Sequence, residues 1–271
     1  MCLPYRRSGF TSSVDTTSMQ VDSAPSWLLM WRFASPNMRG TKMVDGGRLP
    51  GAAPVFWDLD GTLIHSDPVH DASILHACAA QGLALAALPP LPAGASGPEV
   101  YRALFGGAGD DGLPARYAAW YDATVDYVLA HLASAQPAAS AVRFCRWLGS
   151  RGVAQTLVSN SHPRIIAAAL EQLDLRHRFT HLCSGDEVAH PKPAPDVYLR
   201  AAALHGRAPA ACVAFEDSAN GIRAARAAGM AVIALSADPA LHALAGQGFD
   251  PADEDAWRAL QASWPVTGGL G

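Results

Sequence analysis

Lysine is almost absent from this chain of 271 residues. Lys42 and Lys192 are the only two, and every other one of the 20 basic residues is an arginine. With 24 acidic residues the net charge is -4. Nucleic-acid-binding proteins need a clustered basic surface, so this balance argues against a nucleic-acid partner. The scarcity also makes the lysine at position 192 conspicuous.

Long hydrophobic runs and paired cysteines are missing as well. The longest apolar candidate, residues 26–31, ends at Arg32, whereas a membrane-spanning helix needs about 20 apolar residues. The five cysteines are scattered, and no two are spaced Cys-x-x-Cys. This pattern argues against a zinc site or a disulfide framework. We therefore expect a cytoplasmic protein that acts without a membrane.

Half of the residues are hydrophobic and 16% are charged, which is enough apolar material for a packed core. Residues 1–52 show no convincing period, and we expect them to form a disordered extension. From Pro54 onward, short apolar runs alternate with helical stretches. The strands are predicted at 55–57, 153–158, 180–183, 212–215 and 231–235, and the helices at 138–149, 163–173, 195–205 and 219–228. This alternation predicts an α/β fold, with a parallel sheet covered on both faces.

Residues 68–135 interrupt the alternation. Helices are predicted at 68–81, 98–105 and 114–133, with a segment rich in proline and glycine at 88–98. An all-helical insert of this size between the first two strands indicates a cap over the sheet. The predicted domains are therefore a catalytic core of residues 53–67 and 136–271 and a helical cap of residues 68–135.

The first predicted strand ends in Asp58-Leu59-Asp60-Gly61-Thr62. Residues i and i+2 of an extended chain point the same way, so both carboxylates face one site. Two such close carboxylates need a divalent cation or a shared proton. One of them then serves as nucleophile and the other as acid and base. The alternative is a capping pair of aspartates in a surface turn.

Three more polar clusters follow predicted strands, at the sheet edge where open parallel sheets bind ligands. Ser159-Asn160-Ser161 precedes a helix and suits a phosphate, unless it is a plain helix cap. Lys192 lies between prolines and suits a phosphoryl group or a buried carboxylate, unless it is a solvated loop lysine. Glu216-Asp217-Ser218 offers oxygen ligands to a hard cation, unless its acids only stabilise a helix N-terminus.

Taken together, the four clusters resemble the four motifs of the haloacid dehalogenase-like hydrolase superfamily. The matching segments are Asp58-Leu59-Asp60-Gly61-Thr62, Ser159-Asn160, Lys192-Pro193-Ala194-Pro195-Asp196 and Phe215-Glu216-Asp217-Ser218-Ala219-Asn220-Gly221. The resemblance covers residues 54–235. It implies a Rossmann-like, three-layer core with a mobile helical cap, and it implies Mg²⁺ as cofactor.

The resemblance also implies a role for each motif residue. Asp58 is the nucleophile that forms an aspartyl phosphate, and Asp60 protonates the leaving oxygen and then activates water. Ser159 and Lys192 hold the transferring phosphoryl oxygens, with help from the Asn160 backbone amide.

The metal ligands implied by the same resemblance are Asp58, the backbone carbonyl of Asp60, and Asp217. Glu216 joins them either directly or through water. The expected function is an Mg²⁺-dependent phosphatase of a small phosphorylated metabolite, such as a sugar phosphate or a phosphoglycolate-like compound, working as a monomer or a small homo-oligomer.

Departures from the family pattern narrow the subclass. Trp57 occupies a position where the family usually has phenylalanine, which indicates a change in packing. The family's dehalogenases lack an acid at the position of Asp60, so we do not expect this chain to hydrolyse carbon–halogen bonds. Its phosphonate hydrolases use a cap lysine, and residues 66–150 contain none. A binding or regulatory protein on the same scaffold is a further alternative, although none of the catalytic positions is missing.

A hexose-phosphate mutase is the nearest alternative. Ser66, Asp67 and His70 match the linker of such mutases, and His70 is expected to contact Asp60 in the closed state. However, His162 and the segment Ser96-Gly97-Pro98 stand where mutases carry basic residues. We therefore favour the phosphatase.

The cap side of the substrate pocket is the least determined part of the site. The candidate residues there are His70, Ser96, Arg102 and His162.

Overall fold

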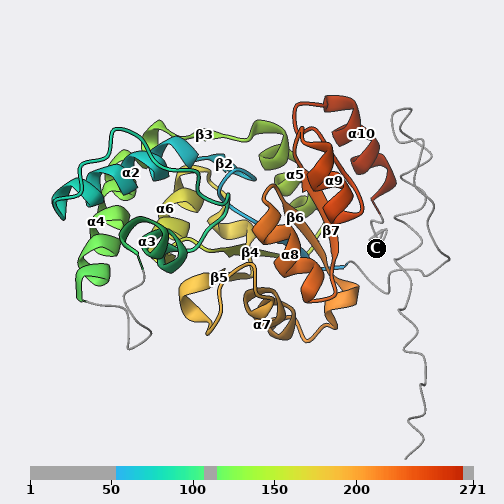
Figure 1. The fold of residues 1–271 in the computed structure, drawn as a ribbon. Helices are drawn as coiled ribbons and strands as arrows, with labels where there is room; N and C mark the ends of the chain where they lie inside the picture. The colour runs from blue at the N-terminus through green and yellow to red at the C-terminus, as the bar shows by residue number, and fades with distance from the viewer. Residues whose placement is uncertain (1–52, 107–114, 265–271) are drawn as a thin grey trace, which may run out of the picture.

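The computed structural model describes residues 53–106 and 115–264. A six-stranded parallel sheet with the order β5-β4-β1-β6-β7-β8 forms its centre (Figure 1). The strands are β1 (Val55–Trp57), β4 (Gln155–Ser159), β5 (His181–Ser184), β6 (Val213–Glu216), β7 (Ala231–Leu235) and β8 (Gly248–Phe249). Strand β1 lies between β4 and β6, and all three of its residues are buried. The predicted α/β fold class is thereby confirmed.

Helices cover both faces of the sheet because alternate strand residues point to opposite sides. On one face, Trp57 belongs to a hydrophobic cluster with α5 (Ala139–Ser150), α6 (Pro163–Gln172) and α10 (Glu254–Ser263). On the other face, Phe56 belongs to a cluster with α7 (Asp196–Leu204), α8 (Ala219–Ala227) and α9 (Pro239–Ala245). The result is a three-layer core.

The predicted elements of the core agree with the observed ones to within about two residues at each end. Four short elements were not predicted: the antiparallel pair β2 (Ile64–His65) and β3 (Gln136–Pro137), the edge strand β8, and the helix α9. Helix α10 was also missed. Four 3₁₀ turns complete the described chain: Leu132–Ser134, Arg176–Arg178, Gly185–Glu187 and Pro209–Ala211. Two-residue strands carry no periodicity that a sequence pattern can register.

Three helices lie between β2 and β3 in the chain: α2 (Asp67–Ala80), α3 (Gly97–Phe105) and α4 (Ala115–His131). They gather beyond one end of the sheet (Figure 1). They share a separate hydrophobic cluster, in which Tyr101 packs against Phe105, Tyr117 and Trp120. A second body with its own apolar centre fits the predicted cap, whose limits at residues 68 and 135 stay a prediction. The predicted extension of residues 1–52 lies outside the described residues.

The unusual Trp57 is accommodated by its neighbours in the core. Its ring stacks on Phe215 at a centroid distance of 4.3 Å, and its Nε1–H donates to Gln155 Oε1 at 2.8 Å. Gln155 itself is fully buried and donates to the Cys145 carbonyl oxygen at 3.1 Å. A buried indole N–H needs an acceptor, and Gln155 supplies it.

The described residues contain no helix that is both long enough and apolar enough to cross a membrane. Four cysteines fall within them, and all four are buried and free of disulfide bonds: Cys78, Cys145, Cys183 and Cys212.

Candidate active site

The four predicted clusters meet in one cavity of about 380 Å³ at the carboxyl edge of the sheet. Asp58 follows β1, Ser159 ends β4, and Asp217 follows β6, while Lys192 enters from the loop before α7. The cap helices α2 and α4 and the loop before α3 supply the opposite wall. Because β4, β1 and β6 are neighbours in the sheet, residues that lie far apart in the chain meet at this edge.

Lys192 lines the cavity and is 2% exposed. Its Nζ donates to Asp58 Oδ1 at 2.8 Å, to Glu216 Oε1 at 2.6 Å and to the Val158 carbonyl oxygen at 2.8 Å. Burial lowers the pKa of Lys192, but the carboxylates of Asp58 and Glu216 outweigh it and raise that pKa above the ordinary value. Lys192 is a buried, charged group and not a solvated loop lysine.

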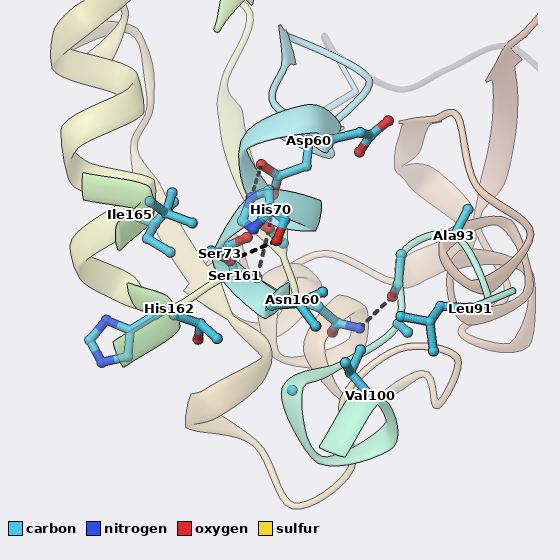
Figure 2. A pocket seen from close by; sticks show the side chains of 18 of the residues that line it. Asp60, His70, Ser73, Leu91, Ala93, Val100, Asn160, Ser161, His162 and Ile165 are labelled. Atoms are coloured by element: carbon cyan, nitrogen blue, oxygen red, sulfur yellow. Dashed lines mark hydrogen bonds and ion pairs between the residues drawn. The ribbon is translucent and has the colours of Figure 1, made fainter. Parts of the chain in front are cut away.

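The loop that carries Lys192 is held by the side chain of Asn160. Its Oδ1 accepts the Lys192 backbone N–H at 3.0 Å, and its Nδ2 donates to the Lys192 carbonyl oxygen at 3.0 Å. The same Nδ2 donates to the Gly94 carbonyl oxygen of the loop before α3, also at 3.0 Å (Figure 2). Asn160 thus connects the lysine loop with the cap.

Three carboxylates gather around the lysine. Ligand oxygens of Asp58, Glu216 and Asp217 all lie within 4.8 Å of one another. Burial raises the pKa of Asp58 to about 8, against the lowering effect of Lys192, and burial together with Asp58 raises the pKa of Asp217 well above its ordinary value. The raised pKa values show that one ammonium does not compensate three ionised carboxylates at this spacing. A divalent cation bound by oxygen ligands fits this set.

Gly61 allows this cluster to form. Its φ is +81°, and a Cβ placed there would lie 1.9 Å from Asp217 Oδ2. Thr62 Oγ1 then donates to Asp217 Oδ1 at 3.2 Å. The turn after β1 therefore brings its backbone against the acid at the end of β6, which only glycine permits.

The side chain of Asp60 belongs to a different network from that of Asp58. Its Oδ1 accepts from Ser66 Oγ at 2.6 Å and pairs with His70 Nε2 at 3.0 Å, while its Oδ2 accepts from Ser161 Oγ at 2.6 Å and from Ser159 Oγ at 3.3 Å. Burial opposes ionisation, but His70 and the hydroxyl groups hold the pKa of Asp60 well below its usual range. Asp60 is ionised in this arrangement, and the expected contact with His70 is present.

The cap-side candidates separate into two groups. His70 and His162 line the cavity, as Figure 2 shows for both. Ser96 is buried and caps α3 together with Glu99. Arg102 is exposed on α3 and does not line the cavity.

Two functional contacts were not anticipated. Ser161 was noted only as part of a phosphate-binding segment, yet its hydroxyl contacts Asp60. Tyr198 of α7 donates its hydroxyl to Glu216 Oε1 at 2.5 Å and is fully buried. Tyr198 lies two residues after the lysine motif ends, and the only signal in the sequence was a hydroxyl group on an otherwise apolar face of the helix.

A family model for haloacid dehalogenase-like hydrolases matches residues 55–229. The chain belongs to this family. The match spans all four motifs, and the haloacid dehalogenase-like hydrolase fold explains why Asp58, Lys192 and the acids that follow β6 converge at one sheet edge.

Two curated proteins and one solved structure illustrate what this chain is similar to. Protein CbbY of Rhodobacter capsulatus is 32% identical over 225 residues, covering 79% of this chain and 95% of CbbY. Fructose-1-phosphate phosphatase YqaB of Escherichia coli is 46% identical over 84 residues, covering 31% of this chain and 44% of YqaB. The crystal structure of a CbbY variant of Rhodobacter sphaeroides in complex with xylulose 1,5-bisphosphate has a TM-score of 0.62 at 22% identity, over 74% of this chain and 96% of that one.

Proposed function

We propose that this hydrolase is an Mg²⁺-dependent phosphatase of small phosphorylated metabolites, with sugar phosphates and phosphoglycolate-like compounds as candidates. The observation that carries the proposal is the ion pair of Asp58 with Lys192, 2.8 Å apart, in the wall of the cavity. Asp58 is 7% exposed, so its accessible oxygen faces the cavity. The names of two curated relatives, a fructose-1-phosphate phosphatase and a hexitol phosphatase, support the same reaction class.

In the first step, an Asp58 carboxylate oxygen forms a bond to phosphorus while the ester P–O bond breaks. The leaving oxygen takes a proton from Asp60. In the second step, water attacks phosphorus and gives a proton to Asp60, and the Asp58 O–P bond breaks. Asp58 is then regenerated and inorganic phosphate is released.

Electrostatics explain why these residues serve this reaction. A carboxylate that attacks a phosphate dianion meets repulsion, and fixed positive charge reduces that cost. Lys192 supplies one such charge, held at 2.6 Å from Glu216 and unable to swing away. Ser159 and Asn160 lie beside it and would contact the phosphoryl oxygens.

Asp58, Asp217 and Glu216 would hold Mg²⁺, together with the Asp60 backbone carbonyl. The bound ion would supply a Lewis acid that offsets the phosphoryl charge. The side chain of Asp60 is outside the acid cluster, which agrees with the assignment of its carboxylate to proton transfer.

In the proposed cycle, the Asp60 carboxyl group has to be protonated for the first step and ionised for the second. The ionised state seen here suits the second step, in which it accepts a proton from water. For the first step it has to take up a proton, which separation from His70 favours, because His70 is the main charge that lowers the Asp60 pKa. Cap movement that carries α2 and His70 away from Asp60 would provide this change.

The test is phosphate release from a panel of phosphorylated metabolites, with Mg²⁺ and with a chelator, by the wild type and by Asp58→Asn. We expect metal-dependent release by the wild type, and a loss of several orders of magnitude in the variant, about 10³-fold or more. Release by pure Asp58→Asn protein would contradict the mechanism. No release by folded wild type, combined with isomerisation of a hexose 1-phosphate, would indicate the mutase; neither activity would indicate a binding protein. Cytoplasmic location and a monomer or small homo-oligomer remain predictions.

A further inference from the structure

The α2 side of the cavity carries negative charge close to the catalytic groups. Asp67, at the start of α2, and Asp71, one turn further, both line the cavity. Both side chains are exposed at its rim. Partial burial, followed by the nearby Asp60 carboxylate, raises the pKa of Asp67. The organic part of a substrate whose phosphate reaches Lys192 would lie close to these two acids.

Positive charge is missing from the same wall. Among the described residues that line the cavity, Lys192 is the only lysine or arginine, and it is already paired with Asp58 and Glu216. His70 is paired with Asp60. His162 Nδ1 accepts the Arg164 backbone N–H at 3.1 Å, so this nitrogen is already used within the chain.

The remaining wall is apolar or neutral. Ile74, Val100, Val125 and Ile165 present aliphatic surface, and Figure 2 shows Val100 and Ile165 at two sides of the cavity. Arg102, the one arginine predicted to shape the pocket, is outside it.

We propose that this enzyme selects phosphate monoesters whose organic part is uncharged, and that it rejects substrates carrying a second anionic group. The proposal rests on the phosphatase function above. A second phosphate or a carboxylate would lose its hydration on entering the cavity without gaining a cationic partner. It would also approach Asp67 and Asp71, and charges of like sign repel at this range.

This selectivity distinguishes between the two candidate substrate classes, sugar phosphates and phosphoglycolate-like compounds. It favours neutral sugar and polyol monophosphates over phosphoglycolate-like compounds, whose carboxylate is a second anion. It also distinguishes this chain from the CbbY variant that binds a bisphosphate, and it places the chain with the relative named fructose-1-phosphate phosphatase.

The experiment compares kcat/KM within pairs of esters that differ only by the second anion. One pair is 2-hydroxyethyl phosphate and phosphoglycolate, which are close in size; the other is fructose 1-phosphate and fructose 1,6-bisphosphate. We expect the neutral member of each pair to be preferred by about tenfold or more at low salt. The preference should shrink at high salt, because the rim acids are exposed and therefore screened.

Two charge-matched variants connect the preference to the rim. Asp71→Asn removes an acid that lines the cavity, while Asp122→Asn removes an exposed acid of α4 that does not line it. We expect the preference to fall about threefold in Asp71→Asn and to stay at the wild-type value in Asp122→Asn.

Three outcomes are distinguishable. A neutral preference that weakens in Asp71→Asn alone supports the proposal. Equal or faster hydrolysis of the anionic members overturns it and leaves the phosphatase function intact. No phosphate release from any ester, with acetyl phosphate included as a generic donor, overturns the phosphatase function and the selectivity together.

Discussion

At the scale of single residues, Lys192 explains much of the site. It is the one buried cation among the three acids at the end of the sheet. Replacing it with methionine keeps the length of the side chain and removes the charge. We expect Lys192→Met to lower phosphate release by about 10³-fold, measured with the ester that the wild type hydrolyses best. Lys192→Arg should also be impaired, because the bulkier, planar guanidinium cannot replace a compact ammonium at three acceptors; wild-type activity in either variant would contradict the assigned role.

The Asp60–His70 ion pair makes stability depend on pH. The Asp60 pKa is lowered on folding, so its contribution is present above its ordinary value of 3.8 and is lost as the pH falls toward the folded value. The His70 pKa is raised, so its contribution is present below 6.5 and is lost as the pH rises through the folded value. The pair is therefore fully effective between about pH 4 and 6.5.

We accordingly expect His70→Gln to lower the free energy of unfolding by about 1 kcal/mol near pH 5.5, and by less at pH 9. Urea unfolding at both values measures the difference. A deficit that is larger at pH 9 would show that the pair does not act as an ion pair.

Trp57 and Gln155 provide a third residue-scale prediction. Gln155→Leu leaves the buried Trp57 N–H without its acceptor, and we expect a loss of about 1–3 kcal/mol in the free energy of unfolding. Trp57→Phe in the same chain removes the orphaned donor and should restore part of this loss. A double-mutant cycle in urea checks the coupling, and strictly additive losses would mean that the hydrogen bond contributes little.

At the scale of elements, the turn after β1 places the catalytic acids. Gly61→Ala introduces a Cβ that meets Asp217 at 1.9 Å, in addition to the strain of a left-handed φ. Gly82→Ala is a matched control, because Gly82 has φ +80° and no neighbour within 4 Å. We expect both variants to lose about 1–2 kcal/mol of stability.

Only Gly61→Ala should also weaken Mg²⁺ binding, which calorimetric titration of the purified protein measures directly. Equal metal affinities in the two glycine variants would mean that the close approach to Asp217 is unimportant for the metal.

Elements also show what the sequence was able to predict. The strands that carry motifs are buried on both sides, so they appear as short apolar runs followed by polar residues, and β1, β4 and β6 were located in this way. The edge strand β8 has two residues, and nothing in Gly248–Phe249 distinguishes it from a loop.

The sequence predicted the candidate site residues that belong to short motifs, and it missed the contacts that depend on how helices pack. Asp58, Lys192 and Asp217 follow from their motifs. The Tyr198 contact with Glu216 and the position of Arg102 outside the cavity depend on how helices pack, which one sequence does not encode in a readable pattern.

At the scale of the whole molecule, a few polar contacts join the cap to the core. Tyr121 of α4 donates its hydroxyl to Asp186 Oδ2 at 2.8 Å, and Asn160 donates to Gly94. We expect Tyr121→Phe to increase amide hydrogen exchange in α4 about threefold or more, because a lost hydrogen bond is worth about 1 kcal/mol. Exchange in β1 should be unchanged, and equal increases in both elements would indicate general destabilisation instead of cap release.

The strand order also constrains how the enzyme is made. The proposed nucleophile, Asp58, follows β1, but β1 is completed by one neighbour at residues 155–159 and by another at residues 213–216. While the ribosome is still synthesising the second half, Asp58 has no buried lysine beside it and no acid partner from β6. The proposed catalytic centre therefore assembles only after residue 217 has emerged, so a translation product that ends before β6 carries the proposed nucleophile without its acid partners.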